Sequence, residues 1–163
     1  MSILIDSGVF YAFYNRRDVH HLDSICLLTH VLEGRFGRPF TSDLVVSEVY
    51  TLLRRRVGFK AAIAFLEALR KSGISVIFLD EALYDGVIRV LKDHTNRVLS
   101  FTDAFLLLLL NELKIDFLAT YDERSFTGLA GGIIGRGYAK ELPESEVKKI
   151  LARVQDWLGK GGR

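Results

Sequence analysis

The chain has 163 residues, of which 49% are hydrophobic and 26% are charged, and its formal net charge is +2. This length and composition indicate a globular domain with a sizeable core and exclude a disordered chain. Cys26 is the single cysteine, which excludes an internal disulfide and a cysteine-rich zinc site. The N-terminal segment MSILIDSGVF has neither a basic flank nor a long apolar stretch, so we expect no signal peptide and a cytoplasmic location.

The first half of the chain alternates short apolar runs with longer amphipathic segments. Ile3 to Ile5 shows no polar alternation, as expected of a strand that is covered on both faces. Asp43 precedes an apolar periodic segment, so we expect it to cap a helix. In chain order, the predicted elements are a strand at 3–5, a short helix at 9–14, a helix at 22–32, a possible strand at 39–42, helices at 44–56 and 59–71, and a strand at 74–79.

The second half contains seven consecutive hydrophobic residues, Ala104 to Leu110, directly after Asp103. A membrane-spanning helix needs roughly 18 or more apolar residues, so we interpret this run as a buried helix that starts at Thr102 or Asp103. The remaining predicted elements are a helix at 81–92, the leucine-rich helix to about 114, a strand at 117–120, an edge strand around 133–134, and a helix at 144–158 before a frayed tail, GKGGR.

Strands that alternate with helices along the whole chain predict a parallel sheet flanked by helices. We find no internal repeat and no linker, so residues 1–163 are predicted to form one domain. Its core spans about 3–126, and a glycine-rich stretch and a helix follow at 127–163. The glycine-rich stretch has no GxxxxGK[ST] pattern, which favours a loop or edge turn over a phosphate-binding loop.

Carboxylates stand where the predicted strands end and the predicted helices begin. Asp6 and Asp122 follow strands, and Asp103 opens the leucine-rich helix. The carboxyl ends of parallel strands share one sheet edge, so we expect these side chains to face one crevice. Glu48 lies at the margin of the apolar face of the helix at 44–56. Each residue alone could be a cap, a turn former or a solvated helix residue, but four on one edge indicate a shared site.

Four converging carboxylates repel one another unless a cation lies among them. Oxygen ligands without His or Cys favour Mg²⁺ or Mn²⁺ over zinc. Such an ion can activate a water molecule and neutralise charge on a phosphodiester, so the predicted chemistry is metal-assisted phosphodiester hydrolysis. Basic clusters such as Arg54 to Arg56 could meet phosphates, although exposed charge on a solvated helix face is the commoner reading.

Four segments, ILIDSGVFYAF, SDLVVSEVYTLLRR, LSFTDAFLLLLLNE and FLATYDERSF, resemble the PIN-domain family, and specifically its VapC-type toxin ribonucleases. The resemblance runs from Ile3 to Phe126. It implies an α/β fold, a PIN-like three-layer α/β/α sandwich with a mostly parallel sheet, and a Mg²⁺- or Mn²⁺-dependent endoribonuclease. It also implies the following roles: catalytic and metal-binding for Asp6, Glu48, Asp103 and Asp122, and supporting for Ser7, Thr102 and Thr120.

The resemblance further implies an RNA substrate, a small antitoxin protein as partner and a homodimer, and no membrane association. Two alternatives stay open: a PIN-domain nuclease of RNA processing without an antitoxin, and a catalytically silent module that binds RNA or protein. An aspartyl phosphatase of the haloacid-dehalogenase type needs a second aspartate where this chain has Gly8. The aromatic run from Val9 to Tyr14 is a candidate protein-interaction surface if part of it is exposed.

Overall fold

A five-stranded, entirely parallel sheet forms the centre of the molecule, with strand order β3-β2-β1-β4-β5. The computed structural model describes the backbone of residues 1–160 and the side chains of residues 1–156. The strands are β1 (Ser2–Ile5), β2 (Arg38–Ser42), β3 (Ser75–Ile77), β4 (Phe117–Thr120) and β5 (Gly132–Gly135). The predicted parallel sheet is confirmed, including the edge strand in the glycine-rich stretch.

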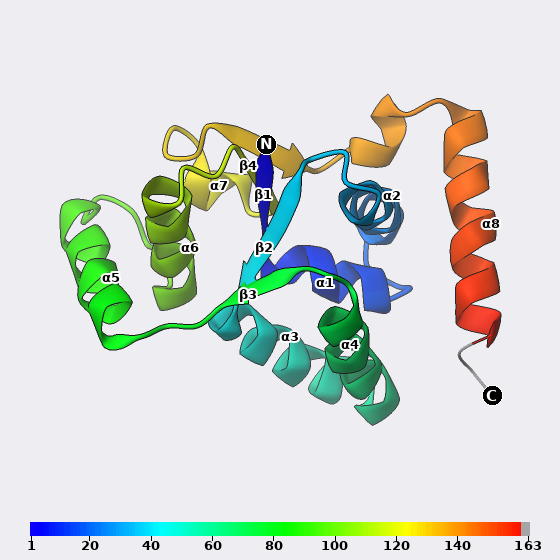
Figure 1. Ribbon diagram of the computed structural model, residues 1–163, viewed down its shortest axis with the longest axis horizontal. Coiled ribbons are helices and arrows are strands. Elements are labelled where there is room, and N and C mark those ends of the chain that lie inside the picture. Colours follow the sequence, from blue (N-terminus) through cyan, green and yellow to red (C-terminus); the bar gives the residue numbers. More distant parts are fainter. Residues whose placement is uncertain (161–163) are drawn as a thin grey trace.

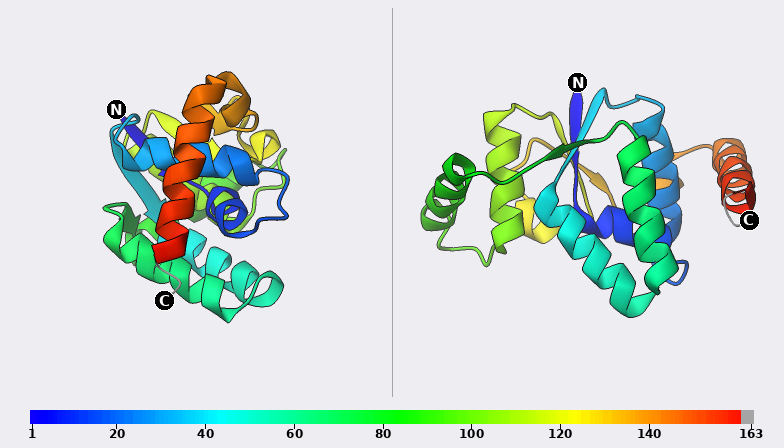
Figure 2. Two further views of the ribbon diagram at one scale, coloured as in Figure 1. Left: turned by 90° about the vertical axis from the view of Figure 1, so that its right-hand side faces the viewer. Right: turned by 60° about the horizontal axis from the view of Figure 1, so that its bottom comes forward.

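Helices cover both faces of the sheet (Figures 1 and 2). On one side, α6 lies next to the sheet and α5 packs outside it, whereas α1, α2 and α4 lie on the other side. The helices are α1 (Ser7–Tyr14), α2 (His21–Leu32), α3 (Asp43–Arg56), α4 (Phe59–Lys71), α5 (Glu81–Asp93), α6 (Phe101–Glu112), α7 (Glu123–Phe126), the 3-10 helix η1 (Tyr138–Glu141) and α8 (Glu144–Lys160). The predicted three-layer α/β/α sandwich is therefore confirmed.

The core lies where the central strand meets the leucine-rich helix. All three residues Ile3, Leu4 and Ile5 are fully buried, as predicted for a strand covered on both faces. Every residue of α6 from Ala104 to Leu110 is buried as well, so the apolar run serves packing within the domain. No helix within residues 1–160 is long and apolar enough to cross a membrane.

Three predicted helix starts differ from the structure, and each difference concerns a cap. Helix α1 begins at Ser7 and not at Val9, because Asp6 caps it. Ser42, not Asp43, caps α3: its hydroxyl accepts the Val45 N–H at 3.2 Å. The Asp43 carboxylate accepts the Leu44 N–H and also the Leu79 N–H from the loop after β3. Helix α6 begins earlier than predicted, at Phe101, with Ser100 as its cap.

The C-terminal segment packs outside the helical layer that contains α2. Helix α8 contacts α2 through its apolar face, where Ile150 is fully buried, and it lies at the right-hand edge of the molecule in Figure 1. The helix continues to Lys160, two residues beyond the predicted end, and therefore takes in the first two residues of the predicted GKGGR tail. The rest of that tail, 161–163, lies outside the described residues.

Candidate active site

Asp6 stands at the carboxyl end of the central strand, next to the point where the strand order changes direction between β1 and β4. Its backbone N–H continues the pairing with β4 by donating to the Ala119 carbonyl at 3.0 Å. Its carboxylate caps α1: the Ser7 N–H donates to Oδ1 at 2.7 Å, and the Thr120 hydroxyl donates to Oδ2 at 2.7 Å. In an open parallel sheet, this switch point is where ligands bind.

The environment of Asp6 disfavours its negative charge. The side chain is 7% exposed, and burial is the largest cause that raises the pKa of this carboxyl from 3.8 to about 6. The hydrogen bonds from Thr120 and Ser7 lower the pKa, while the negative charges of Asp103 and Glu48 raise it further. Asp103 and Glu48 are therefore close enough to Asp6 to act on its ionisation.

Glu48 reaches this site from the middle of α3, which starts beyond the end of β2. The residue is half-buried, as expected from its place at the margin of the apolar face. The Thr102 hydroxyl, on α6, donates to Oε1 of Glu48 at 2.5 Å. Because this bond joins two helices that approach from different sides of the sheet edge, Thr102 fixes where the Glu48 carboxylate lies.

Asp103 lies in the first turn of α6 and is not itself the capping residue. The Ser100 hydroxyl accepts the Asp103 N–H at 3.0 Å, and the Asp103 carboxylate accepts the Ser100 N–H at 2.9 Å. This reciprocal pair is a capping box, which satisfies two backbone donors and holds the carboxylate at the positive end of the helix. Sequence reasoning missed Ser100, although the S-x-x-D spacing carries the signal.

Asp122 is the most exposed of the four predicted carboxylates. It caps the short helix α7, where its Oδ1 accepts the Ser125 N–H at 3.2 Å and its Oδ2 accepts the Ser125 hydroxyl at 2.6 Å. Its own N–H donates to the Thr120 hydroxyl at 3.0 Å. The Thr120 hydroxyl thus contacts Asp6 and Asp122 at once. Ser125 was not predicted, but the D-x-x-S spacing is the signal for it.

The structure brings the four carboxylates to one edge without gathering all of them around a common point. The charges of Glu48 and Asp103 act on Asp6, and the backbone N–H of Asp122 bonds the Thr120 hydroxyl that supports the Asp6 carboxylate. Within the part of the chain whose side chains are described, no group of three or more His, Cys, Asp and Glu residues is arranged to hold a metal ion. Each carboxylate instead accepts hydrogen bonds from neighbouring hydroxyl or N–H groups.

The donor chemistry of this edge nevertheless fits a hard divalent cation. The four side chains offer only carboxylate oxygens, which Mg²⁺ and Mn²⁺ prefer. Burial is the main cause of the raised pKa of Asp6, the negative charges of Asp103 and Glu48 add to it, and a cation would offset both by favouring the ionised carboxylate. The supporting hydroxyls of Thr102 and Thr120 can orient ligand oxygens in the manner of outer-shell groups.

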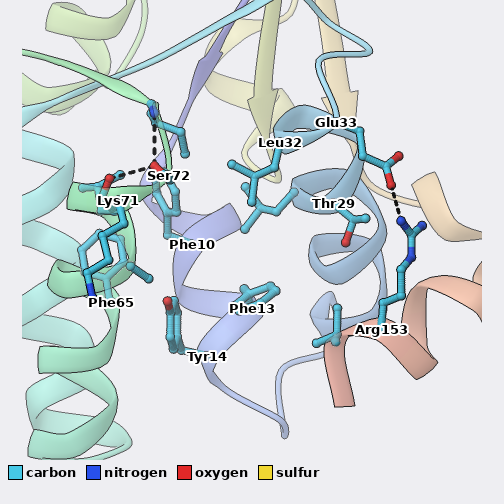
Figure 3. A pocket seen from close by; sticks show the side chains of 15 residues that line it. Phe10, Phe13, Tyr14, Thr29, Leu32, Glu33, Phe65, Lys71, Ser72 and Arg153 are labelled. Atoms are coloured by element: carbon cyan, nitrogen blue, oxygen red, sulfur yellow. Dashed lines mark hydrogen bonds and ion pairs between the residues drawn. The ribbon is translucent and has the colours of Figure 1, made fainter. Parts of the chain in front are cut away.

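An apolar cavity of about 480 Å³ lies between α1, α2, α4 and α8, apart from the carboxylates (Figure 3). Phe13 and Tyr14, at the end of the predicted aromatic helix, are half-buried on its wall, and Phe10 and Phe65 line it further in. Arg153 of α8 lies at its rim, paired with Glu33. Part of the aromatic segment is therefore exposed in a concave surface, as required for the protein-interaction surface that the sequence suggested.

The geometry can be set beside known proteins. The family model for the PIN domain matches residues 3–131. A VapC ribonuclease of Archaeoglobus fulgidus is 36% identical over 158 residues, which are 96% of this chain and 97% of that protein. The crystal structure of Mycobacterium tuberculosis VapC20, a toxin that cleaves the sarcin–ricin loop, has a TM-score of 0.66 at 27% identity and covers 79% of this chain and 97% of its own.

A more distant solved structure, FitAcB from Neisseria gonorrhoeae, has a TM-score of 0.58 and 18% identity over 86% of this chain and 99% of its own. At that identity the likeness shows the fold alone. The family model ends at residue 131, one residue before β5 begins, so β5, η1 and α8 lie beyond it.

Proposed function

Because this chain belongs to the PIN-domain family, we propose that it is a Mg²⁺- or Mn²⁺-dependent endoribonuclease with Asp6, Glu48, Asp103 and Asp122 as its metal-binding and catalytic carboxylates. Similarity to a VapC ribonuclease over nearly the whole length of both chains supports RNA as the substrate. The observation that carries the proposal is the buried Asp6 at the switch point, with its pKa raised by burial and by two neighbouring carboxylates.

In this proposal a bound ion supplies positive charge to the phosphate and lowers the pKa of a water molecule. Asp6 is the anchor, since the Ser7 N–H and the Thr120 hydroxyl fix both of its oxygens. Glu48, whose carboxylate accepts the Thr102 hydroxyl, would be a second ligand of the ion. Burial, and then the charges of Asp103 and Glu48, hold the pKa of Asp6 high, and a bound cation would favour its ionised form, so the affinity for the cation should rise as Asp6 loses its proton.

Asp103 and Asp122 hold the two outer positions of the proposed site. Asp103 is half-buried at the positive end of α6, where its charge is favoured. Asp122 is exposed and can reach water, so we assign it the orientation of the attacking water and the acceptance of its proton. Ser125 contacts both oxygens of Asp122 and would give way when Asp122 takes up this role.

The test compares two isosteric changes at opposite ends of one helix. Asp103→Asn removes a charge from the site but keeps an oxygen that accepts the Ser100 N–H. Glu112→Gln removes a charge from the exposed C-terminal end of α6. Purified protein is incubated with structured and single-stranded RNA in Mn²⁺, in Mg²⁺ and in EDTA. We expect cleavage that EDTA and Asp103→Asn abolish and that Glu112→Gln leaves unchanged.

The outcomes separate the alternatives. Cleavage that survives both EDTA and Asp103→Asn would overturn the metal-nuclease proposal. Binding of RNA without cleavage in either metal would favour a silent binding module. Cleavage of one structured RNA in preference to all others would favour a toxin over a nuclease of general RNA processing, because a toxin acts on a defined target.

We further propose that the protein is the toxin of a type II toxin–antitoxin pair and forms a homodimer. The VapC relative and the VapC20 toxin support this role. We assign the antitoxin segment to the apolar cavity of Figure 3, because concave surfaces lined by aromatic side chains suit an apolar helix face. A short gene beside this one that encodes a DNA-binding domain would support the toxin role, and Phe13→Asp should then abolish co-purification of its product. Light scattering measures the oligomeric state.

A further inference from the structure

Arg97 connects the segment that precedes Asp103 to the segment that follows Asp122. It lies in the loop between α5 and α6, three residues before the Ser100 cap. Its guanidinium donates to the Thr127 carbonyl at 2.7 Å, to the Ser125 carbonyl at 3.2 Å and to the Arg124 carbonyl at 3.4 Å. These three acceptors come from the last turn of α7 and its C-terminal cap.

The chemistry of this contact depends on the shape of the guanidinium. The last carbonyls of a helix have no partner within the helix, and α7 has only four residues. A planar cation with five N–H donors can satisfy several of these carbonyls at once and meets the negative end of the helix. A lysine ammonium offers a single centre and cannot span the same three oxygens.

Each of the two outer carboxylates of the proposed site is hydrogen-bonded to a serine. Ser100 exchanges hydrogen bonds with Asp103, and Ser125 holds both oxygens of Asp122. Arg97 is in the same loop as Ser100, and it bonds directly to the carbonyl of Ser125. The guanidinium therefore links the two supports on which the outer carboxylates of the proposed site rest.

We infer that Arg97 is a positioning residue that sets the separation of Asp103 and Asp122 and thereby tunes divalent-cation binding at the candidate site. The inference rests on the proposed function. Arg97 itself contacts only backbone carbonyls and takes no part in the chemistry. Changes to groups that bond a metal ligand directly typically weaken metal binding about 10- to 100-fold, and Arg97 acts through the segments that carry the ligands, so we expect an effect at the lower end of that range.

The experiment compares Arg97→Met, Arg97→Lys and Arg97→Ala with a matched control, Arg89→Met. Arg89 is exposed on α5 in the same half of the molecule. Mn²⁺ binding is measured directly by electron paramagnetic resonance without RNA, and the Mn²⁺ dependence of RNA cleavage is measured separately. Circular dichroism checks the fold of each variant.

We expect Arg97→Met to raise the Kd for Mn²⁺ about tenfold while Arg89→Met leaves it unchanged. Arg97→Lys should recover little of the lost affinity, and millimolar guanidinium ion should restore part of it in Arg97→Ala. Rescue by guanidinium ion distinguishes a positioning role from a general loss of stability. If Arg97→Met fails to fold, Arg97→Lys and the rescue of Arg97→Ala still test whether Arg97 positions the carboxylates.

Wild-type Mn²⁺ affinity in Arg97→Met, or in Arg97→Lys where only that variant folds, would overturn the inference. A wild-type protein that neither binds Mn²⁺ nor cleaves RNA would instead overturn the proposed function. A wild-type protein that does both, beside an equally competent Arg97→Met variant, would overturn the role of Arg97 alone.

Discussion

Charged side chains are paired at the contact between α2 and α8, whereas the carboxylates at the carboxyl edge of the sheet have no cationic partner among the described side chains. At the second contact, Arg153 donates to Glu33 at 2.7 Å, and Glu146 contacts both Arg35 and His30. At the sheet edge, none of the ion pairs between described side chains involves Asp6, Glu48, Asp103 or Asp122. The ion pairs between α2 and α8 connect two elements of the fold. The like charges at the sheet edge repel one another and lower stability, so their retention indicates a site that binds a ligand.

The largest expected effect is on activity at the sheet edge. Asp6→Asn removes the charge of the anchor residue but keeps its size and one acceptor oxygen. We expect RNA cleavage to fall by roughly a hundredfold or more, as is typical when a single electrostatic contact to the reacting group is lost. Single-turnover cleavage in saturating Mn²⁺ measures the effect, and activity near the wild-type level would remove Asp6 from the site.

The same variant should be more stable than the wild type when no metal is present. A pKa raised from 3.8 to about 6 corresponds to an unfavourable charge of about 3 kcal/mol at neutral pH, of which Asn recovers about 1 to 2 kcal/mol. Because the folded pKa lies above the unfolded one, wild-type folding gains stability as pH falls through 6. Urea unfolding in EDTA should therefore show a difference that shrinks toward pH 4, and a less stable Asp6→Asn would contradict this account.

At the α2–α8 contact, the expected pH effect has the opposite sign. His30 is fully buried; its Nδ1 lies 2.7 Å from the Tyr138 hydroxyl, and its Nε2 lies 3.0 Å from Glu146 without hydrogen-bond geometry. Burial, and then the nearby Arg35, lower the pKa of His30, while Glu146 and Glu33 oppose this.

The folded protein therefore favours neutral His30. The contribution of His30 to the free energy of unfolding is highest above about pH 6.5 and falls below it, because protonation of His30 favours the unfolded chain. After correction for the intrinsic pH dependence of amide exchange, we expect weaker protection of α8 at about pH 5.5 than at about pH 7.5, and a smaller difference in His30→Gln. His94→Gln, at the C-cap of α5, is the control, because α5 lies on the opposite side of the sheet from α8 and the His94 Nδ1 lies 2.9 Å from the Val90 carbonyl of its own helix. An unchanged α8 at both pH values would refute the prediction.

The smallest expected effect concerns the exposed pair between Arg153 and Glu33. The side chain of Arg153 is 62% exposed, so solvent screens its attraction to Glu33. Arg153→Ala should lower the free energy of unfolding by less than about 1 kcal/mol, as measured by thermal denaturation. A larger loss would mean that α8 depends on this pair more than on the burial of Ile150.

The parts of the fold set by local pattern could be predicted from the sequence. The buried strand at Ile3 to Ile5 and the helix from Phe59 to Lys71 were found because hydrophobic periodicity and glycine stops are local signals. The gathering of Asp6 and Asp103 at one edge followed from the rule that parallel strands end on the same side.

What could not be predicted depends on contacts between distant segments. Asp43 has the right chemistry for a cap, but the Leu79 N–H from another loop engages it and Ser42 takes the cap. Arg97 gave no signal at all, because its acceptors follow some thirty residues later and become neighbours only when α6 and β4 are in place. The amphipathic pattern of α8 predicts that one face is buried, but it does not show that α2 is the element that buries it.

The central position of the first strand has a consequence for synthesis on the ribosome. Thr120 and Asp6 are separated by 114 residues, yet the hydroxyl of one supports the carboxylate of the other. Pairing over such a separation forms slowly and only after β4 has emerged. A nascent or prematurely terminated chain that lacks β4 therefore has no assembled site, and the cell meets a competent molecule only after β4 has been synthesised.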